Sequence, residues 1–194
     1  MVVDSVTRVA APTALALVVF QFTAAGAIHA FNPRSIADAI ALHPWLRFRS
    51  LPLRTLRLVG RAFGLTEFTV ALGVVLGFIT RVPTIALAFA SVATVLSAFF
   101  VGWVLTAVRS GTGAPCGCDA GSEEANAGSV LRTALTLFSS TYLTALVIDG
   151  DVPSIWDAKA DVLVIASLSA ASFAVLTWQL PKALSTPNGV PAEQ

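Results

Sequence analysis

Residues 82–108 form a stretch of 27 residues without a single charged side chain. As an α-helix, which rises about 1.5 Å per residue, this stretch would be about 40 Å long. The hydrocarbon core of a bilayer is about 30 Å thick, and about 20 mainly apolar residues cross it. A helix that is apolar on all sides has to be buried in a large core or in a membrane. The stretch therefore predicts a membrane-spanning helix.

The composition of the whole chain supports a membrane protein. Only 12% of its 194 residues are charged, against roughly 25% in soluble globular domains, and its mean hydropathy is +0.80. The formal net charge of +1 lacks the basic excess that marks nucleic-acid-binding proteins. We therefore expect an all-α integral membrane protein surrounded by the lipid bilayer, with no nucleic acid as a partner.

Four further stretches have the length and polarity of membrane spans. Two of them are uncharged, and two carry one charged residue each, Glu67 and Arg132. Trp178, near the end of the last stretch, is typical of an interfacial anchor. We expect a single transmembrane domain over residues 1–182 and a flexible tail over 183–194. The five predicted spans are residues 9–28, 62–80, 82–108, 129–148 and 162–180.

The connection between the first two spans is patterned. Asn32 followed by Pro33 is typical of a helix start, and Ile36 and Ile40 follow at helical spacing. The remainder mixes aromatic residues with the arginines Arg47, Arg49, Arg54 and Arg57. Such a mixture suits the headgroup region of a bilayer. We predict an interfacial amphipathic segment, which either only connects the two spans or covers a site near the membrane surface.

The distribution of basic residues predicts an orientation. With five spans, the first connection, the loop between the third and fourth spans, and the C-terminus share one side of the membrane. Nine of the 12 basic residues lie on that side, and only Arg8, Arg81 and Lys159 lie on the other. Such an excess is typical of the cytoplasmic side. We expect a multi-pass protein of the cell membrane whose N-terminus is outside and whose C-terminus and third loop are cytoplasmic.

That third loop holds the only two cysteines of the chain, Cys116 and Cys118, in a polar, glycine-rich segment. Three uses of the pair are open. A disulfide between them would close a very small ring, and strained disulfides are labile or catalytic rather than structural. Two soft thiolates can instead bind Cu(I) or share a zinc site. The third alternative is a pair of reduced, inert thiols.

Three further residues are candidates for supporting roles. Arg132 begins the fourth span, and a cation near a thiol lowers its pKa, although acidic residues in the loop act in the opposite direction. Glu67 lies within the second span, where ionisable residues usually face the bundle interior. It is either a proton relay or contact to a quinone or partner, or a structural partner of Arg61 or His29. His29 is either a group that titrates near neutral pH or an interfacial anchor.

The order of a membrane helix, a glycine-rich loop, Cys116-Gly117-Cys118, an arginine and another membrane helix resembles the methylamine-utilisation MauE family. That family is grouped with the DoxX-like small membrane proteins. The resemblance covers about residues 9–148, and Arg132 stands at the family's arginine.

Other positions of the chain resemble the family or depart from it. The family has Phe-Gly after the second cysteine, where this chain has Asp119-Ala120, and Asn after the arginine, where it has Thr133. His29 stands where the family usually has lysine. Glu67 resembles the acidic residue of the family's second helix.

The resemblance implies a fold and a function. The fold is a DoxX-like four-helix bundle, to which this chain adds one C-terminal membrane helix. The function is thiol-redox chemistry through catalytic Cys116 and Cys118, in concert with a thioredoxin-like partner, for the maturation of disulfide-containing proteins outside the cytoplasm. A quinone is the cofactor that the DoxX-like relatives suggest. The cytoplasmic loop predicted from the basic residues conflicts with a disulfide role outside.

Two other functions stay open. The chain could be a non-catalytic accessory subunit of a larger respiratory or redox complex in the membrane, with incidental cysteines. It could also be a soft-metal-handling membrane protein, in which Cys116 and Cys118 bind the metal.

Overall fold

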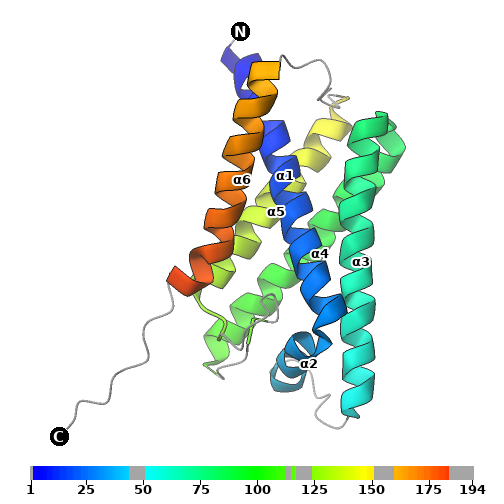
Figure 1. The fold of residues 1–194 in the computed structure, drawn as a ribbon, viewed down its shortest axis with the longest axis vertical. Helices are drawn as coiled ribbons and strands as arrows, with labels where there is room; N and C mark the ends of the chain where they lie inside the picture. Colours follow the sequence, from blue (N-terminus) through cyan, green and yellow to red (C-terminus); the bar gives the residue numbers. More distant parts are fainter. Residues whose placement is uncertain (1, 44–50, 112–114, 117–123, 151–159, 184–194) are drawn as a thin grey trace, which may run out of the picture.

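The computed structural model describes residues 2–43, 51–111, 115–116, 124–150 and 160–183. These residues form six helices: α1 (Val2–Phe31), α2 (Pro33–Leu42), α3 (Leu53–Thr80), α4 (Pro83–Ser110), α5 (Ala127–Ile148) and α6 (Ala160–Ala183). The five long helices run along the long axis of the molecule, and the short α2 sits at its lower end (Figure 1). The prediction of an all-α fold is confirmed.

The local sequence explains several helix ends. Pro33 and Pro83 occupy the first turns of α2 and α4, where the missing N–H of proline costs nothing. Gly111 ends α4 in the left-handed conformation, with φ of +60°. The side chain of Asn126 accepts a hydrogen bond from the backbone N–H of Ser129 and so caps α5. These signals place α5 directly after the cysteine loop.

Four of the helices are long and apolar enough to cross a membrane. The candidate spans are Val9–Phe31, Leu53–Thr80, Pro83–Ser110 and Ala127–Ile148. They overlap the first four predicted spans, which supports a multi-pass membrane protein. The fifth predicted span falls within α6, which packs against α1 and α5. Because α6 is not among the candidate spans found in the described residues, its crossing of the membrane stays a prediction.

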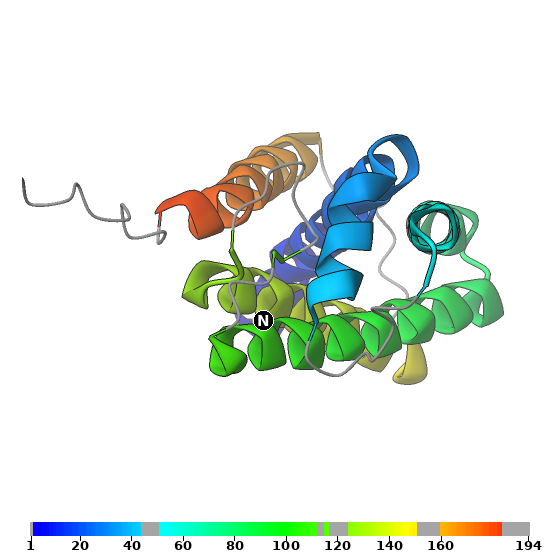
Figure 2. The ribbon, with the colours of Figure 1, turned by 90° about the horizontal axis from the view of Figure 1, so that it is seen from below.

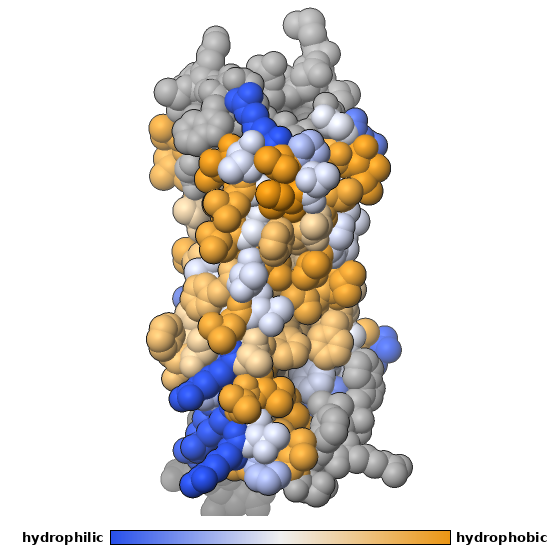
Figure 3. Space-filling view, turned by 90° about the vertical axis from the view of Figure 1, so that its right-hand side faces the viewer, coloured by the Kyte–Doolittle hydropathy of each residue, from blue (hydrophilic) through white to orange (hydrophobic). Residues whose placement is uncertain are grey.

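Polar and apolar side chains are distributed as in a protein that lipid surrounds. Large apolar residues such as Leu65 and Val95 are exposed, whereas the ionisable Glu67 and Arg132 are buried inside the bundle. In Figure 3, hydrophobic side chains cover the middle of the face that it shows, and hydrophilic ones gather towards its two ends. This is the arrangement that a bilayer requires, because its core offers no partner for polar groups.

The helices alternate in direction, and this brings the segments of interest to one end. The end of α1, the start of α3, the end of α4, the start of α5 and the end of α6 all lie at the lower end in Figure 1. Seen from below in Figure 2, α1 lies between α3 and α6. It also packs against α5, whereas α4 packs against α3 and α5. The connection after α1 and the cysteine loop therefore share one end of the bundle.

Only the first part of the predicted interfacial segment forms a helix of its own, and its last part belongs to α3. The predicted helix start is confirmed, since α2 begins at Pro33 and buries Ile36 and Ile40. The assignment of Arg54 and Arg57 to this segment was wrong. Both are exposed on the first turns of α3, because the helix already begins after Pro52. Residues 44–50, which include Arg47 and Arg49, lie outside the described residues, as does the predicted tail from residue 184 on.

Glycines set how closely α3 approaches its neighbours. A Cβ atom added at Gly64 would lie 2.6 Å from the backbone nitrogen of Ala30 and 2.7 Å from the carbonyl oxygen of Gly26. At Gly77 the same atom would lie 2.6 Å from Cα of Ala86 in α4. No real Cβ fits at such distances. Close backbone contact at small residues is how membrane helices associate without a hydrophobic driving force between them.

The contact of Gly64 with α1 predicts a stability effect. Gly64→Ala is expected to destabilise the protein by about 1–3 kcal/mol, because the added methyl group meets the backbone of α1 rather than a movable side chain. The neighbouring Leu65→Ala is the control, since Leu65 is 63% exposed and faces away from α1. Thermal unfolding of the full chain in detergent micelles measures both. Equal stability of the two variants would contradict the packing.

Candidate functional site

The candidate site lies at the lower end of the bundle, where the chain passes from α4 to α5. Pro115 and Glu124 form an isolated antiparallel bridge, so the two described parts of the loop lie side by side. Cys116, next to this bridge, is only 4% exposed. Cys118 and Asp119 lie outside the described residues. The predicted pairing of the two cysteines therefore stays a prediction.

The thiol of Cys116 is covered by apolar side chains. It belongs to a cluster of buried residues contributed by α2, α3 and α4, whose other members are Ile36, Ala37, Ile40, Leu56, Trp103 and Val104. The helix α2 thus packs in the same buried cluster as Cys116. Of the two predicted uses of this segment, this packing favours a cover over a mere connection.

Arg132 brings a positive charge to the thiol. Its Nη2 atom donates a hydrogen bond to Sγ of Cys116 at 3.7 Å. Arg132 as a whole is 2% exposed, and the central carbon of its guanidinium lies 5.0 Å from the centre of the Trp178 ring. A cation over the face of an indole ring is attracted by the ring's quadrupole. The structure therefore places one of the predicted supporting residues directly at the first cysteine.

The other two predicted supporting residues form a separate pair. Nδ1 of His29 in α1 and Oε2 of Glu67 in α3 are 2.6 Å apart, and both side chains are 1% exposed. They lie beside the crossing of Gly26 and Gly64, whose close contact brings the two helices together. Of the two partners considered for Glu67, the structure selects His29. This hydrogen bond links α1 to α3 inside the membrane.

Three further contacts join α6 to α1 and to the cap of α5. Thr177 accepts a hydrogen bond at 3.3 Å from the side-chain amide of Gln21 in α1. The carbonyl oxygen of Pro181 accepts one at 2.8 Å from the side chain of Asn126, the cap of α5. Trp178 also meets Phe20 edge to face. The sequence suggests only an interfacial anchor for Trp178. It does not reveal the contact of Trp178 with Arg132, because the two residues are 46 positions apart.

A histidine that sequence reasoning did not single out lies close to the thiol cluster. His43 is 3% exposed, and its ring stacks on that of Trp103 with the ring centres 3.5 Å apart. Its Nε2 lies 3.1 Å from the carbonyl oxygen of the same tryptophan. Since a carbonyl only accepts, Nε2 carries the proton of this hydrogen bond. No motif marked His43, because its partner is 60 residues away in the chain.

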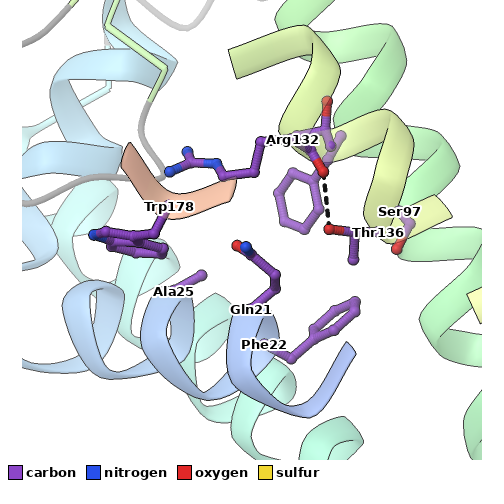
Figure 4. Close-up of a pocket in the computed structure, with 9 residues that line it drawn as sticks. Gln21, Phe22, Ala25, Ser97, Arg132, Thr136 and Trp178 are labelled. Carbon is purple, nitrogen blue, oxygen red and sulfur yellow. Dashed lines mark hydrogen bonds between the residues drawn. The ribbon is translucent and has the colours of Figure 1, made fainter. Parts of the chain in front are cut away.

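A small, partly open pocket with a mainly apolar wall lies beside Arg132 (Figure 4). Figure 4 shows Arg132 and Thr136 from α5, Gln21 from α1 and Trp178 from α6 around it. The hydroxyl of Thr136 donates to the carbonyl oxygen of Arg132 at 3.0 Å. Within the described part of the chain, no three His, Cys, Asp or Glu side chains gather as metal ligands would.

Four candidate membrane-spanning helices are the features of a small multi-pass membrane protein. A comparison with protein families identifies its family. The model of methylamine utilisation protein MauE matches residues 6–148, and the chain belongs to the MauE family. No curated protein and no solved structure matches the chain. The matched region contains Cys116 and Arg132, whereas α6 follows it.

The packing of α2 on α3 predicts how accessible Cys116 is. A Cβ added at Gly60 would lie 2.4 Å from Cγ2 of Ile36, and a β-branched side chain has little freedom to turn away. Gly60→Val is therefore expected to displace α2 and to speed alkylation of Cys116 several-fold in a Cys118→Ser background. Mass spectrometry after timed iodoacetamide treatment measures this rate.

The matched control for this prediction is Leu58→Val, because Leu58 is 67% exposed on the same helix. Ile36→Ala, which removes part of the cover directly, is expected to act in the same direction as Gly60→Val. Unchanged alkylation in both variants would show that α2 does not limit access to the thiol.

Proposed function

We propose that this chain is a membrane thiol-redox protein in which Cys116 and Cys118 exchange disulfide bonds with a thioredoxin-like partner. The contact between the Arg132 guanidinium and Sγ of Cys116 is the observation that carries the proposal. A thiolate is the reactive form of cysteine, and a neighbouring cation favours it. Both groups are buried, so the attraction between them is screened less than it would be in water.

The exchange balances without a further reactant. The Cys116 thiolate attacks one sulfur of the partner's disulfide, forms a mixed disulfide and releases the other partner sulfur as a thiolate. The Cys118 thiolate then attacks Sγ of Cys116, which closes the Cys116–Cys118 disulfide and releases the second partner sulfur. The chain's pair is oxidised by two electrons, and the partner's disulfide is reduced by two. The same steps in reverse reduce the chain.

The remaining predicted site residues have supporting roles in this proposal. Arg132 positions its charge at Cys116. His29 and Glu67 hold α1 against α3 through their 2.6 Å hydrogen bond, and α2 follows α1 directly. The pair therefore supports the helix that packs in the same buried cluster as Cys116.

We also propose that the cysteine end faces the cytoplasm. The exposed arginines of α3, Arg54, Arg57 and Arg61, are spaced so that they form one stripe on its first turns. This end is also the one that carries the cysteine loop. Basic residues next to membrane spans are retained in the cytoplasm. A cysteine pair on the cytoplasmic side acts as a thiol relay, and its thioredoxin-like partner binds on that side.

The cysteine pair itself provides the first test. Cys116→Ser and Cys118→Ser are each expected to abolish disulfide exchange with oxidised thioredoxin, because each removes one of the two sulfurs that the exchange requires. Gel mobility after maleimide–polyethylene glycol labelling of the purified full chain measures the redox state. Ser139→Ala, which alters a buried hydroxyl elsewhere in α5, is the control. Normal partner maturation in cells with either serine variant would refute the proposal and favour an accessory subunit.

The charge of Arg132 provides the second test. In a Cys118→Ser background, Arg132→Gln is expected to slow alkylation of Cys116 at pH 7. The rate at high pH should be kept, because the fully ionised thiol no longer needs the cation. The pH of half-maximal rate is expected to rise by about one pH unit, which corresponds to roughly tenfold less thiolate.

Two variants separate this charge effect from general damage. Arg109→Gln removes an exposed arginine at the end of α4 and is expected to leave the pH profile unchanged. Arg132→Lys keeps the charge and should restore part of the rate. An Arg132→Gln profile identical to that of the parent would show that the guanidinium does not stabilise the thiolate.

A further inference from the structure

The first turns of α3 carry three arginines on the side that faces away from the bundle. Arg54, Arg57 and Arg61 are all exposed, whereas Leu56 and Gly60 between them are buried. In an α-helix, residues three and four positions apart are neighbours on one face. The three arginines therefore form one stripe, the arginine stripe. Figure 3, which shows the molecule from the side of α3, has hydrophilic side chains in a line at its lower end.

The face of α3 that carries the stripe continues as an apolar surface. Leu65, Leu72 and Ile79 are all exposed. At about 100° per residue, they lie within roughly 40° of Arg54 and Arg61 around the helix axis. This face points away from the buried side of α3, so in a membrane it contacts lipid. A single face thus has cations at its start and an apolar surface along the rest of its length.

The length of α3 places the stripe at the depth of the lipid phosphates. In residues 62–80 the only charged residue is Glu67, which is buried against His29. As a helix, this segment is about 28 Å long, close to the roughly 30 Å of the hydrocarbon core. Arg61 directly precedes the segment, and Arg54 lies about 10 Å further out along the axis. The headgroup region, which contains the phosphates, begins at the edge of the hydrocarbon core.

The protein around the stripe supplies no anion to it. An exposed ion pair at the same end joins Arg34 to Asp38 of α2 at 3.8 Å. Among the described residues, the side chains of the stripe take part in no salt bridge and no hydrogen bond. A guanidinium is charged at any relevant pH and carries five N–H donors. Neighbouring like charges on a helix destabilise each other, so an anion bound between them is favoured.

We propose that the arginine stripe binds the phosphate of an anionic phospholipid whose acyl chains lie along Leu65 and Leu72. Arginine matches phosphate through paired N–H donors, and Arg57 and Arg61 on successive turns face the same phosphate. An acidic protein segment would match the cations but not the apolar surface that continues from them into the membrane. The site goes beyond the proposed redox function and does not rest on it, because the stripe is no part of the buried cluster around Cys116.

Lipid binding to the purified full chain in detergent tests the proposal. Native mass spectrometry measures apparent dissociation constants for phosphatidylglycerol and for phosphatidylcholine, whose headgroup is zwitterionic. The parent chain is expected to bind phosphatidylglycerol about tenfold more tightly. Arg57→Gln with Arg61→Gln is expected to weaken that binding about 25-fold, because each basic residue at an anionic membrane surface contributes roughly fivefold. Equal binding of the two lipids by the parent chain would overturn the proposal.

A second double variant is the matched control. Arg34→Gln with Arg109→Gln removes the same charge from exposed positions at the same end of the bundle. It is expected to change the affinity for phosphatidylglycerol by no more than about twofold. Equal losses in the two double variants would show a response to net charge alone and would overturn the proposal, as would an unchanged affinity in the stripe variant. Circular dichroism of both variants checks that the helices are kept.

Two competitors separate a lipid from other anions. Glycerol 3-phosphate carries the phosphate without acyl chains and is expected not to displace phosphatidylglycerol at millimolar concentration. Displacement would show a site for small anions and would overturn the assignment to lipid. Oxidised thioredoxin is the protein probe. A stripe variant that loses thioredoxin binding and keeps its affinity for phosphatidylglycerol would assign the stripe to a protein partner instead.

The lipid site and the redox function can fail separately. Cys116→Ser is expected to keep the preference for phosphatidylglycerol, and the stripe variant is expected to keep disulfide exchange in detergent. Loss of the lipid preference in Cys116→Ser would show that the stripe is not an independent site and would overturn the proposal.

Discussion

The burial of Arg132 is the constraint on which the lower end of the molecule depends. A guanidinium stays charged at any relevant pH, and a bilayer offers it no partner. The protein provides partners from two directions, the thiol of Cys116 and the indole ring of Trp178. These partners lie on different segments, so the position of Arg132 requires that the loop, α5 and α6 meet at one point.

A second buried contact between ionisable residues, that of His29 with Glu67, joins α1 to α3. His29 and Glu67 face each other across the crossing of α1 and α3, and this crossing exists only because Gly26 and Gly64 lack a side chain. The glycines allow the close approach, and the hydrogen bond makes it specific. Since α1 also contacts α5 and α6, it connects the His29–Glu67 pair to the helices that surround Arg132.

The sequence predicts the membrane helices well, because hydrophobic length is a local property that each segment carries by itself. The start of α2 after Asn32 and the burial of Ile36 follow from equally local signals. The site is predicted only in its conspicuous residues, the cysteines and the charges within spans. Trp178 and His43 carry no local signal, because their contacts join distant parts of the chain. Arg57 was misplaced because a charged helix end and an interfacial loop have the same composition.

The helix α6 contributes contacts to the candidate site. The match to the MauE family ends at residue 148, yet Trp178 of α6 stacks on the guanidinium, and Pro181 binds the cap of α5. The orientation of Arg132 towards Cys116 therefore depends on a helix beyond the matched segment. The effect of a cation on a thiol depends on the distance between them, so under the proposed function a helix that contacts the guanidinium also affects the reactivity of the thiol. In this chain the fifth long helix is part of the candidate site rather than an appendage to the bundle.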